Sequence, residues 1–289
     1  MLGVSAVSAR SRRNFRGPSV LRQRLLSALV LAGLFIPALF LLPRAGFAAL
    51  VGGVAFVTAY EWAALAQLAR RARLLFALLL ALGGIPLLML DGALGWMLGA
   101  AVVLWFLLSI RLILGARAPA FVHKRVYKLV LAPLVLWPAW LALDALRNLP
   151  DGAWWVLATF MVVWVADSAA YFSGRRFGRH KLAPAISPGK TVEGVAGALA
   201  SVLLAGGAAH AVGPYASLPL VPWLLLLVAV TLISVMGDLH ESQLKREAGV
   251  KDSGALLPGH GGMFDRVDSL LAAAPLMAFG LLQLGVLHG

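Results

Sequence analysis

Long apolar stretches separated by short polar segments make up most of this chain. Nine of the stretches match the length of about 20 residues that a helix needs to cross the hydrocarbon core of a bilayer. The predicted spans lie near residues 25–43, 46–68, 74–90, 93–114, 129–148, 153–173, 192–213, 218–240 and 268–287. The pattern therefore predicts an all-α, polytopic integral membrane protein with about nine transmembrane helices.

Composition supports the same class. Hydrophobic residues account for 61% of the 289 positions and charged residues for 13%, and the mean hydropathy is +0.88. A soluble protein of this length needs a far more polar surface, so that class is excluded. The chain has no cysteine, which excludes disulfides, thiolate metal ligands and a cysteine nucleophile.

The basic residues are distributed unevenly about the predicted spans. With the N-terminus in the cytoplasm, 23 of the 25 Lys and Arg residues fall in cytoplasmic segments, and only Arg44 and Arg147 fall outside. This asymmetry follows the positive-inside rule and predicts a multi-pass protein with a cytoplasmic N-terminus. The net charge of +13 is therefore expected to orient the protein in the membrane and to attract anionic lipid headgroups. A nucleic-acid partner is not expected.

Polar residues at membrane depth are rare in the first half and frequent in the second. Residues 1–150 are expected to supply helices that pack, dimerise or face lipid. Residues 151–289 are expected to form the catalytic region, with cytoplasmic loops at 174–191 and 241–267. In the first half, Glu61 is expected to pair with Arg70 or Arg73 near the cytoplasmic side, and Asp144 is expected to be solvated at the outer side.

The segment from Asp167 to Glu193 contains the first candidate chemistry. Its stretch Ser187–Thr191 ends like a phosphate-binding loop, but residue 184 is Pro where that motif requires Gly, and no strand is predicted before it. The more general expectation is an anion site formed by Lys190 and backbone N–H groups at a helix N-terminus. The alternative, a positively charged loop without a ligand, stays open.

The second candidate surrounds two helix ends. If the eighth helix continues beyond the membrane, Asp238, Glu241 and Lys245 share one face. Glu241 is then expected to form only a helix-stabilising ion pair with Lys245. Asp265 and Asp268 lie three residues apart at the start of the ninth helix. The carboxylates of Asp238, Asp265 and Asp268 are predicted to converge on a hard cation, for which Mg²⁺ is the natural choice beside phosphates.

A glycine-rich turn, Pro258-Gly259-His260-Gly261-Gly262, joins these helix ends. Its glycines are expected to let the backbone approach a ligand closely. His260 is expected to donate a hydrogen bond to a phosphate oxygen or to shuttle a proton. Zinc is not expected, because no second histidine lies at ligand spacing.

The 27 residues from Ser242 to Asp268 resemble the signature of the phosphatidate cytidylyltransferase (CDP-diglyceride synthase) family. The matching positions are Ser242, Lys245, Arg246, Lys251, Asp252, the turn 258–262, Asp265, Arg266 and Asp268. The segments Asp167–Gly194 and Gly237–Ser242 also resemble this family. The first half matches only as generic apolar helices.

The resemblance implies a nucleotidyltransferase of phospholipid biosynthesis. Members transfer the cytidylyl group of CTP to phosphatidic acid, release pyrophosphate and require a divalent cation, so Mg²⁺ is the expected cofactor and the number of ions is left open. It further implies a bacterial inner-membrane protein, a cytoplasmic active site and a homodimer. Asp238 and Asp265 would bind the metal, with Asp268 in support.

The remaining site residues are assigned to the substrates. The expected catalytic residues are Lys245, Arg246, Asp265, Arg266 and His260. The expected substrate-binding residues are Ser242, Lys251, Lys190, Gly259, Gly261 and Gly262.

Two alternative functions remain open. A CTP-dependent lipid kinase would transfer the terminal phosphate and release CDP. A transporter of a phosphorylated lipid predicts internal repeats and sites near the bilayer midplane, whereas the charge here lies on one side. A CDP-alcohol phosphotransferase is excluded, because neither Asp91-Gly92 nor Asp151-Gly152 is followed by Ala-Arg.

Overall fold

The computed structural model describes residues 30, 32–89, 92–114, 125–254 and 261–287. A short helix at Ala32–Leu41 precedes the longer elements. The first half then forms α2 (Arg44–Leu65), α3 (Arg70–Gly84), the 3₁₀ turn η1 (Pro86–Met89), α4 (Leu94–Ile113) and α5 (Arg125–Arg147). The second half forms α6 (Gly152–Phe177), β1 (Lys181–Ala183), β2 (Ser187–Thr191), α7 (Val192–His210), η2 (Gly213–Ser217), α8 (Leu220–Glu247) and α9 (Phe264–Gln283).

The expected fold class is confirmed: the protein is an all-α polytopic membrane protein. Seven helices in the described ranges are long and apolar enough to cross a membrane, and they correspond to the second to eighth predicted spans. The helix in the first span is described only from Ala32 to Leu41. Helix α9 covers most of the ninth span but begins with three charged residues within its first five positions.

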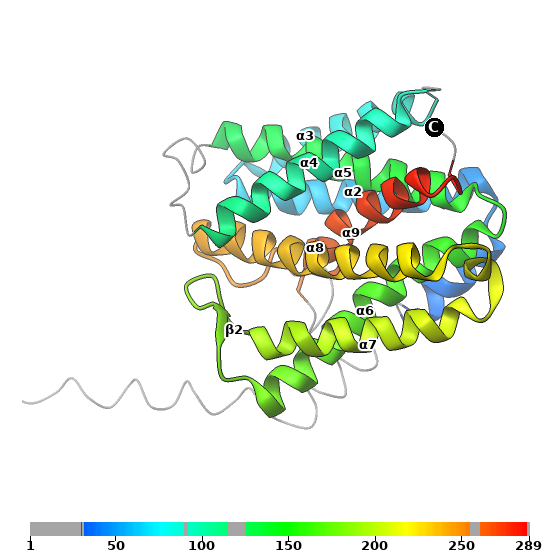
Figure 1. The fold of residues 1–289 in the computed structure, drawn as a ribbon. Coiled ribbons are helices and arrows are strands. Elements are labelled where there is room, and N and C mark those ends of the chain that lie inside the picture. The colour runs from blue at the N-terminus through cyan, green and yellow to red at the C-terminus, as the bar shows by residue number, and fades with distance from the viewer. Residues whose placement is uncertain (1–29, 31, 90–91, 115–124, 255–260, 288–289) are drawn as a thin grey trace, which may run out of the picture.

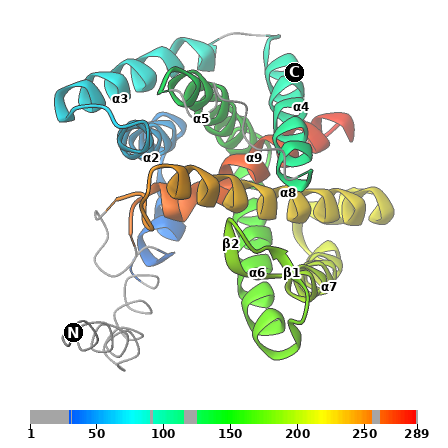
Figure 2. The same ribbon diagram turned by 90° about the vertical axis from the view of Figure 1, so that its left-hand side faces the viewer.

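Helix α8 extends about two turns beyond its predicted end, from residue 240 to Glu247. In Figure 1 it runs through the middle of the molecule, with α6 and α7 on one side and α2 to α5 on the other. Helix α9 packs against α8 and also contacts α2, α4, α5 and α6, so it joins the two halves of the chain (Figure 2).

The segment between α6 and α7 is a short antiparallel hairpin, where only a loop was expected. Lys181 is paired with Thr191 and Ala183 with Ser187. Thr191 caps α7, since its hydroxyl accepts a hydrogen bond from the Gly194 N–H at 3.1 Å. Lys190 thus lies in a strand just before the helix.

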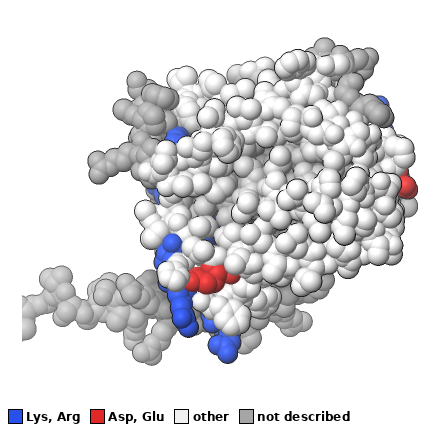
Figure 3. Space-filling model, viewed as in Figure 1, with Lys and Arg blue, Asp and Glu red and all other residues white. Residues whose placement is uncertain are grey.

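Charged residues gather at the ends of the bundle. Figure 3 shows the Lys and Arg side chains of this face concentrated at the end that carries the hairpin, while the flank between the two ends is uncharged. An apolar flank between polar ends is the surface that a bilayer requires.

At the opposite end the expectation of a solvated Asp144 is wrong. Asp144 is buried, and its carboxylate accepts hydrogen bonds from Arg44 at 3.3 Å and from the Asn148 side chain at 2.9 Å. Arg147 donates to the backbone carbonyls of Leu39 and Leu42 at 3.1 Å. Arg44 and Arg147, the two basic residues expected outside the cytoplasm, therefore form hydrogen bonds between helix ends.

Candidate active site

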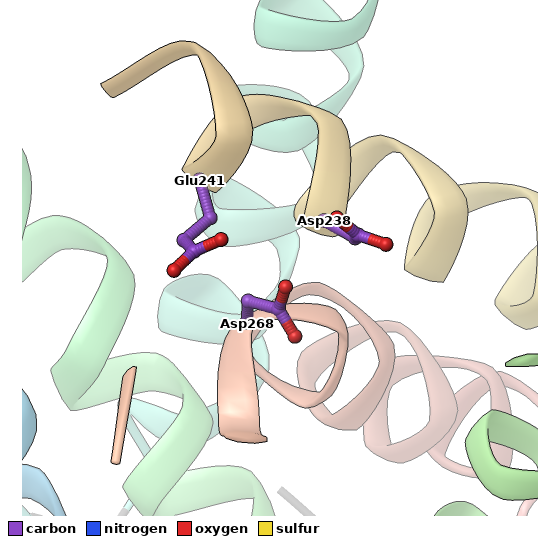
Figure 4. A group of neighbouring side chains, drawn as sticks. All are labelled: Asp238, Glu241 and Asp268. Atoms are coloured by element: carbon purple, nitrogen blue, oxygen red, sulfur yellow. The ribbon is translucent and has the colours of Figure 1, made fainter. Parts of the chain in front are cut away.

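Three carboxylates from α8 and α9 form a cluster. Asp238, Glu241 and Asp268 each place a carboxylate oxygen within 4.8 Å of the others. Figure 4 shows Asp238 and Glu241 on α8, with the Asp268 carboxylate of α9 between them in this view. Their three-residue spacing puts the first two on one helix face.

The close approach of α9 depends on Gly237. A Cβ atom at this position would lie 2.8 Å from the Asp268 carbonyl oxygen and 3.3 Å from the Ser269 Cα. Any larger side chain would push the start of α9 away from α8. Gly237 therefore allows the third carboxylate to reach the other two.

Cationic side chains reach the cluster from two directions. The Lys190 ammonium, on the hairpin, lies 2.7 Å from a carboxylate oxygen of Asp238. The Lys245 ammonium, one turn beyond Glu241 on α8, contacts Glu241 and lies 2.6 Å from Asp265. Asp167 of α6 also interacts electrostatically with Asp238 and Lys190. These cations offset part of the repulsion between the clustered carboxylates.

The donor set fits a hard divalent cation. Glu241 is only 1% exposed, and although Lys245 contacts it, neither of its carboxylate oxygens accepts a well-oriented hydrogen bond from the described residues. A buried carboxylate with unsatisfied oxygens is costly unless it has a further partner. Together with the carboxylates of Asp238 and Asp268, Glu241 offers the oxygen ligands that Mg²⁺ prefers.

Asp265 lies beside this cluster and is not part of it. One carboxylate oxygen pairs with Lys245, and the other accepts hydrogen bonds from the Ser253 N–H and hydroxyl at 2.9 Å and from the Gly262 N–H at 2.8 Å. Of the three predicted metal ligands, the structure brings together Asp238 and Asp268, and Glu241 occupies the place expected for Asp265.

Comparison with known proteins identifies the family of this chain. Residues 22–283 match the family model described as "Cytidylyltransferase family". The chain belongs to the cytidylyltransferase family. It is 40% identical over 260 residues to a phosphatidate cytidylyltransferase of Pseudomonas aeruginosa, an alignment that covers 90% of the chain and 96% of that relative. The corresponding protein of Haemophilus influenzae is 38% identical over 286 residues, covering 90% of the chain and 98% of the relative.

A further predicted site residue, Ser242, contacts the cluster. The Ser242 hydroxyl donates to Asp238 at 3.3 Å. Arg246 is exposed and donates to the Ile186 carbonyl of the hairpin at 3.4 Å, which joins α8 to the hairpin. Lys251, after α8, and Arg266, in the first turn of α9, are both exposed.

The glycine-rich turn is described only in part. Gly259 and His260 lie outside the described residues. Gly261 has a positive φ of 77°, a conformation that favours glycine. Gly262 is buried, and a Cβ there would collide with Glu61 and Ser253. At Gly262 the close approach is thus to the protein's own side chains.

Glu61 is a residue that sequence reasoning misplaced. Its expected pairing with Arg70 or Arg73 is wrong. Its carboxylate accepts hydrogen bonds from the backbone N–H groups of Met263 at 3.0 Å and Phe264 at 2.8 Å, where α9 begins. The signal that was available is a carboxylate in an otherwise apolar helix, which requires a buried partner.

Proposed function

We propose that this protein transfers the cytidylyl group of CTP to phosphatidic acid, giving CDP-diacylglycerol and pyrophosphate. The observation that carries the proposal is the 40% identity to a phosphatidate cytidylyltransferase over 96% of that relative's length. An alignment of this extent includes both the membrane helices and the charged site.

The geometry supports a reaction between a lipid and a soluble nucleotide. The hairpin that carries Lys190 and the C-terminal part of α8, which carries two of the clustered carboxylates, lie at the charged end of an apolar bundle (Figures 1 and 3). A lipid substrate would keep its acyl chains in the bilayer while its phosphate reaches the site. CTP would enter from the aqueous side, where basic residues attract its polyphosphate.

The proposed chemistry is a direct displacement. A phosphate oxygen of phosphatidic acid attacks the α-phosphorus of CTP, and the bond from that phosphorus to the bridging oxygen of the β-phosphate breaks. The electron pair of that bond stays on the pyrophosphate that leaves. Lys245, Arg246, Lys251 and Arg266 are proposed to hold phosphate oxygens, which stabilises the charge that develops in the transition state.

The residues proposed to hold Mg²⁺ are Asp238, Glu241 and Asp268. When bound, the ion would neutralise charge on the phosphates. The proposed role of Asp265 is to hold Lys245, because its oxygens are already hydrogen-bonded. Lys190, which contacts Asp238, is proposed to move between that carboxylate and a substrate phosphate.

Location and assembly are further proposals. We place the protein in a bacterial inner membrane with its N-terminus and active site in the cytoplasm, because 23 of 25 basic residues lie in segments of that side under the predicted topology. The homodimer implied by the family resemblance stays a prediction, and the mass of the detergent-solubilised protein tests it.

The deciding experiment supplies purified protein with phosphatidic acid, Mg²⁺ and CTP labelled at the α-phosphate. Transfer of label into a lipid, with an equal amount of pyrophosphate, is the expected result. Label recovered in water-soluble CDP would indicate transfer of the terminal phosphate instead. A folded protein without turnover would contradict the proposal and favour a transporter.

A further inference from the structure

Glu61 joins the first half of the chain to two segments of the signature, Ser253 and the start of α9. It lies on α2, is 5% exposed, and is about 200 residues away in sequence from its partners. Besides the N–H groups of Met263 and Phe264, its carboxylate accepts a hydrogen bond from the Ser253 hydroxyl at 3.0 Å. It thus contacts the chain on both sides of residues 255–260.

The surrounding packing leaves little freedom for this carboxylate. Added Cβ atoms at Gly254 and Gly262 would both overlap the Glu61 side chain. The neighbouring Trp62 stacks on Phe264 with ring centroids 4.9 Å apart and an interplanar angle of 20°. Two successive α2 residues therefore hold the start of α9 through a hydrogen-bonded contact and an aromatic contact.

These contacts continue toward the carboxylate cluster. The Ser253 hydroxyl has one hydrogen, which is shared between Glu61 and Asp265 at 3.0 and 2.9 Å. Asp265 holds the Lys245 ammonium at 2.6 Å, and Lys245 contacts Glu241 of the cluster. The position of Lys245 thus depends on Asp265, which shares the Ser253 hydroxyl with Glu61.

We propose that Glu61 is a positioning residue for the reaction: it fixes Ser253 and the start of α9 so that Asp265 holds Lys245 beside the cluster. This inference rests on the proposed cytidylyl transfer. Glu61 itself would touch neither substrate nor metal. Its role would be to keep the geometry of the cationic group constant as substrates bind.

The hydrogen bonds to Ser253, Met263 and Phe264 require a side chain with both the carboxylate and the length of glutamate. The N–H groups at the start of α9 have no carbonyl partner within the helix, and a negative charge stabilises that end. Glutamine would place an NH₂ group against at least one of three donors. Aspartate is one methylene shorter and would not reach all of them.

The test compares Glu61→Gln with Asp144→Asn, which changes a buried acid of the first half at the opposite end of the bundle. Turnover is assayed on the folded, monodisperse fraction, and hydrogen exchange is measured for residues 250–254 and 261–266. For Glu61→Gln we expect at least a tenfold loss of kcat, little change in the KM for phosphatidic acid, and faster exchange in both segments. For Asp144→Asn we expect a lower melting temperature with wild-type kcat.

A double-mutant cycle with Ser253→Ala tests whether the effect of Glu61 on turnover passes through Ser253. If Glu61 acts through Ser253 and Asp265, the loss of kcat in Glu61→Gln/Ser253→Ala is smaller than the product of the two single losses. Wild-type kcat in folded Glu61→Gln would overturn the proposal. If Glu61→Gln does not fold, wild-type kcat in Ser253→Ala would overturn it instead.

Failure of the proposed function is distinguishable from failure of this inference. If the wild-type protein does not transfer cytidylyl groups, the exchange measurement still reports whether Glu61 stabilises residues 250–254 and 261–266. Unchanged exchange in Glu61→Gln would show that it does not.

Discussion

Replacing Asp268 by Asn tests whether the three carboxylates are arranged for a cation. Asp268 accepts a hydrogen bond from the Ser269 N–H at 2.7 Å, and it repels Asp238 and Glu241. At the limiting separation of 4.8 Å, two unit charges repel by about 3.5 kcal/mol for an effective dielectric constant of about 20. A shorter separation would increase this repulsion, and the nearby ammonium groups of Lys190 and Lys245 offset part of it.

The expected result is a variant that is inactive and yet no less stable without metal. Asn keeps the shape and the acceptor oxygen for Ser269 but removes the repulsion. Wild-type protein should gain stability as Mg²⁺ is added, by about 2.7 kcal/mol when the ion reaches a hundredfold excess over its Kd. Asp268→Asn should lose most of this gain.

The assay follows thermal unfolding by the fluorescence of the nine tryptophans, with and without Mg²⁺, and measures turnover in parallel. Asp151→Asn is the matched control, because Asp151 is exposed at the other end of the bundle, where it precedes α6. This control should respond to Mg²⁺ as the wild type does. The assignment of the cluster fails if Mg²⁺ stabilises Asp268→Asn and wild type equally, or if the metal-free variant melts several degrees below wild type.

Two further predictions concern a cation of the site and the packing of the first half. Lys190→Met should lower kcat/KM for CTP at least tenfold, because the Lys190 ammonium lies 2.7 Å from Asp238 of the cluster. Lys190→Arg should recover part of this loss. Wild-type kinetics in Lys190→Met would show that Lys190 is not part of the site. Gly52→Ala should cost about 1–3 kcal/mol of stability, since its Cβ would lie 2.7 Å from the Trp140 ring. Gly53→Ala, whose Cβ would meet nothing within 4 Å, should change the melting temperature little, and equal melting of the two variants would contradict this packing.

Apolar length alone was sufficient to predict most helices. Crossing a bilayer requires a nearly continuous apolar stretch, and this requirement does not depend on tertiary contacts. The extension of α8 was also foreseeable, because Asp238, Glu241 and Lys245 share one helical face. The hairpin β1–β2 was missed, since its strands of three and five residues carry no alternating apolar pattern.

The sequence did not show which individual carboxylates form the cluster, and the fold was needed to identify them. By spacing, Asp265 and Asp268 at the start of α9 are equivalent candidates, and Glu241 with Lys245 is an ordinary i, i+4 pair. What separates them is which side of the first turn of α9 faces α8. Asp268 emerges where Gly237 lets the helices meet, whereas Asp265 turns toward Ser253 and Gly262.

The two isolated acids of the first half illustrate the same limit. A carboxylate in an apolar helix must find a partner, and that much follows from the cost of burying an unpaired charge. The nearest cations in sequence were the natural expectation for Glu61, yet its partners are backbone N–H groups about 200 residues away. Asp144 does take an arginine, but one that lies 100 residues earlier in the chain. Helices that cross a membrane side by side bring their ends together whatever their order in sequence, so the partner of a buried charge at a helix end is set by packing. A signature confined to residues 242–268 therefore does not define the whole site, because Ser253, Met263 and Phe264 within it are hydrogen-bonded to Glu61 of α2.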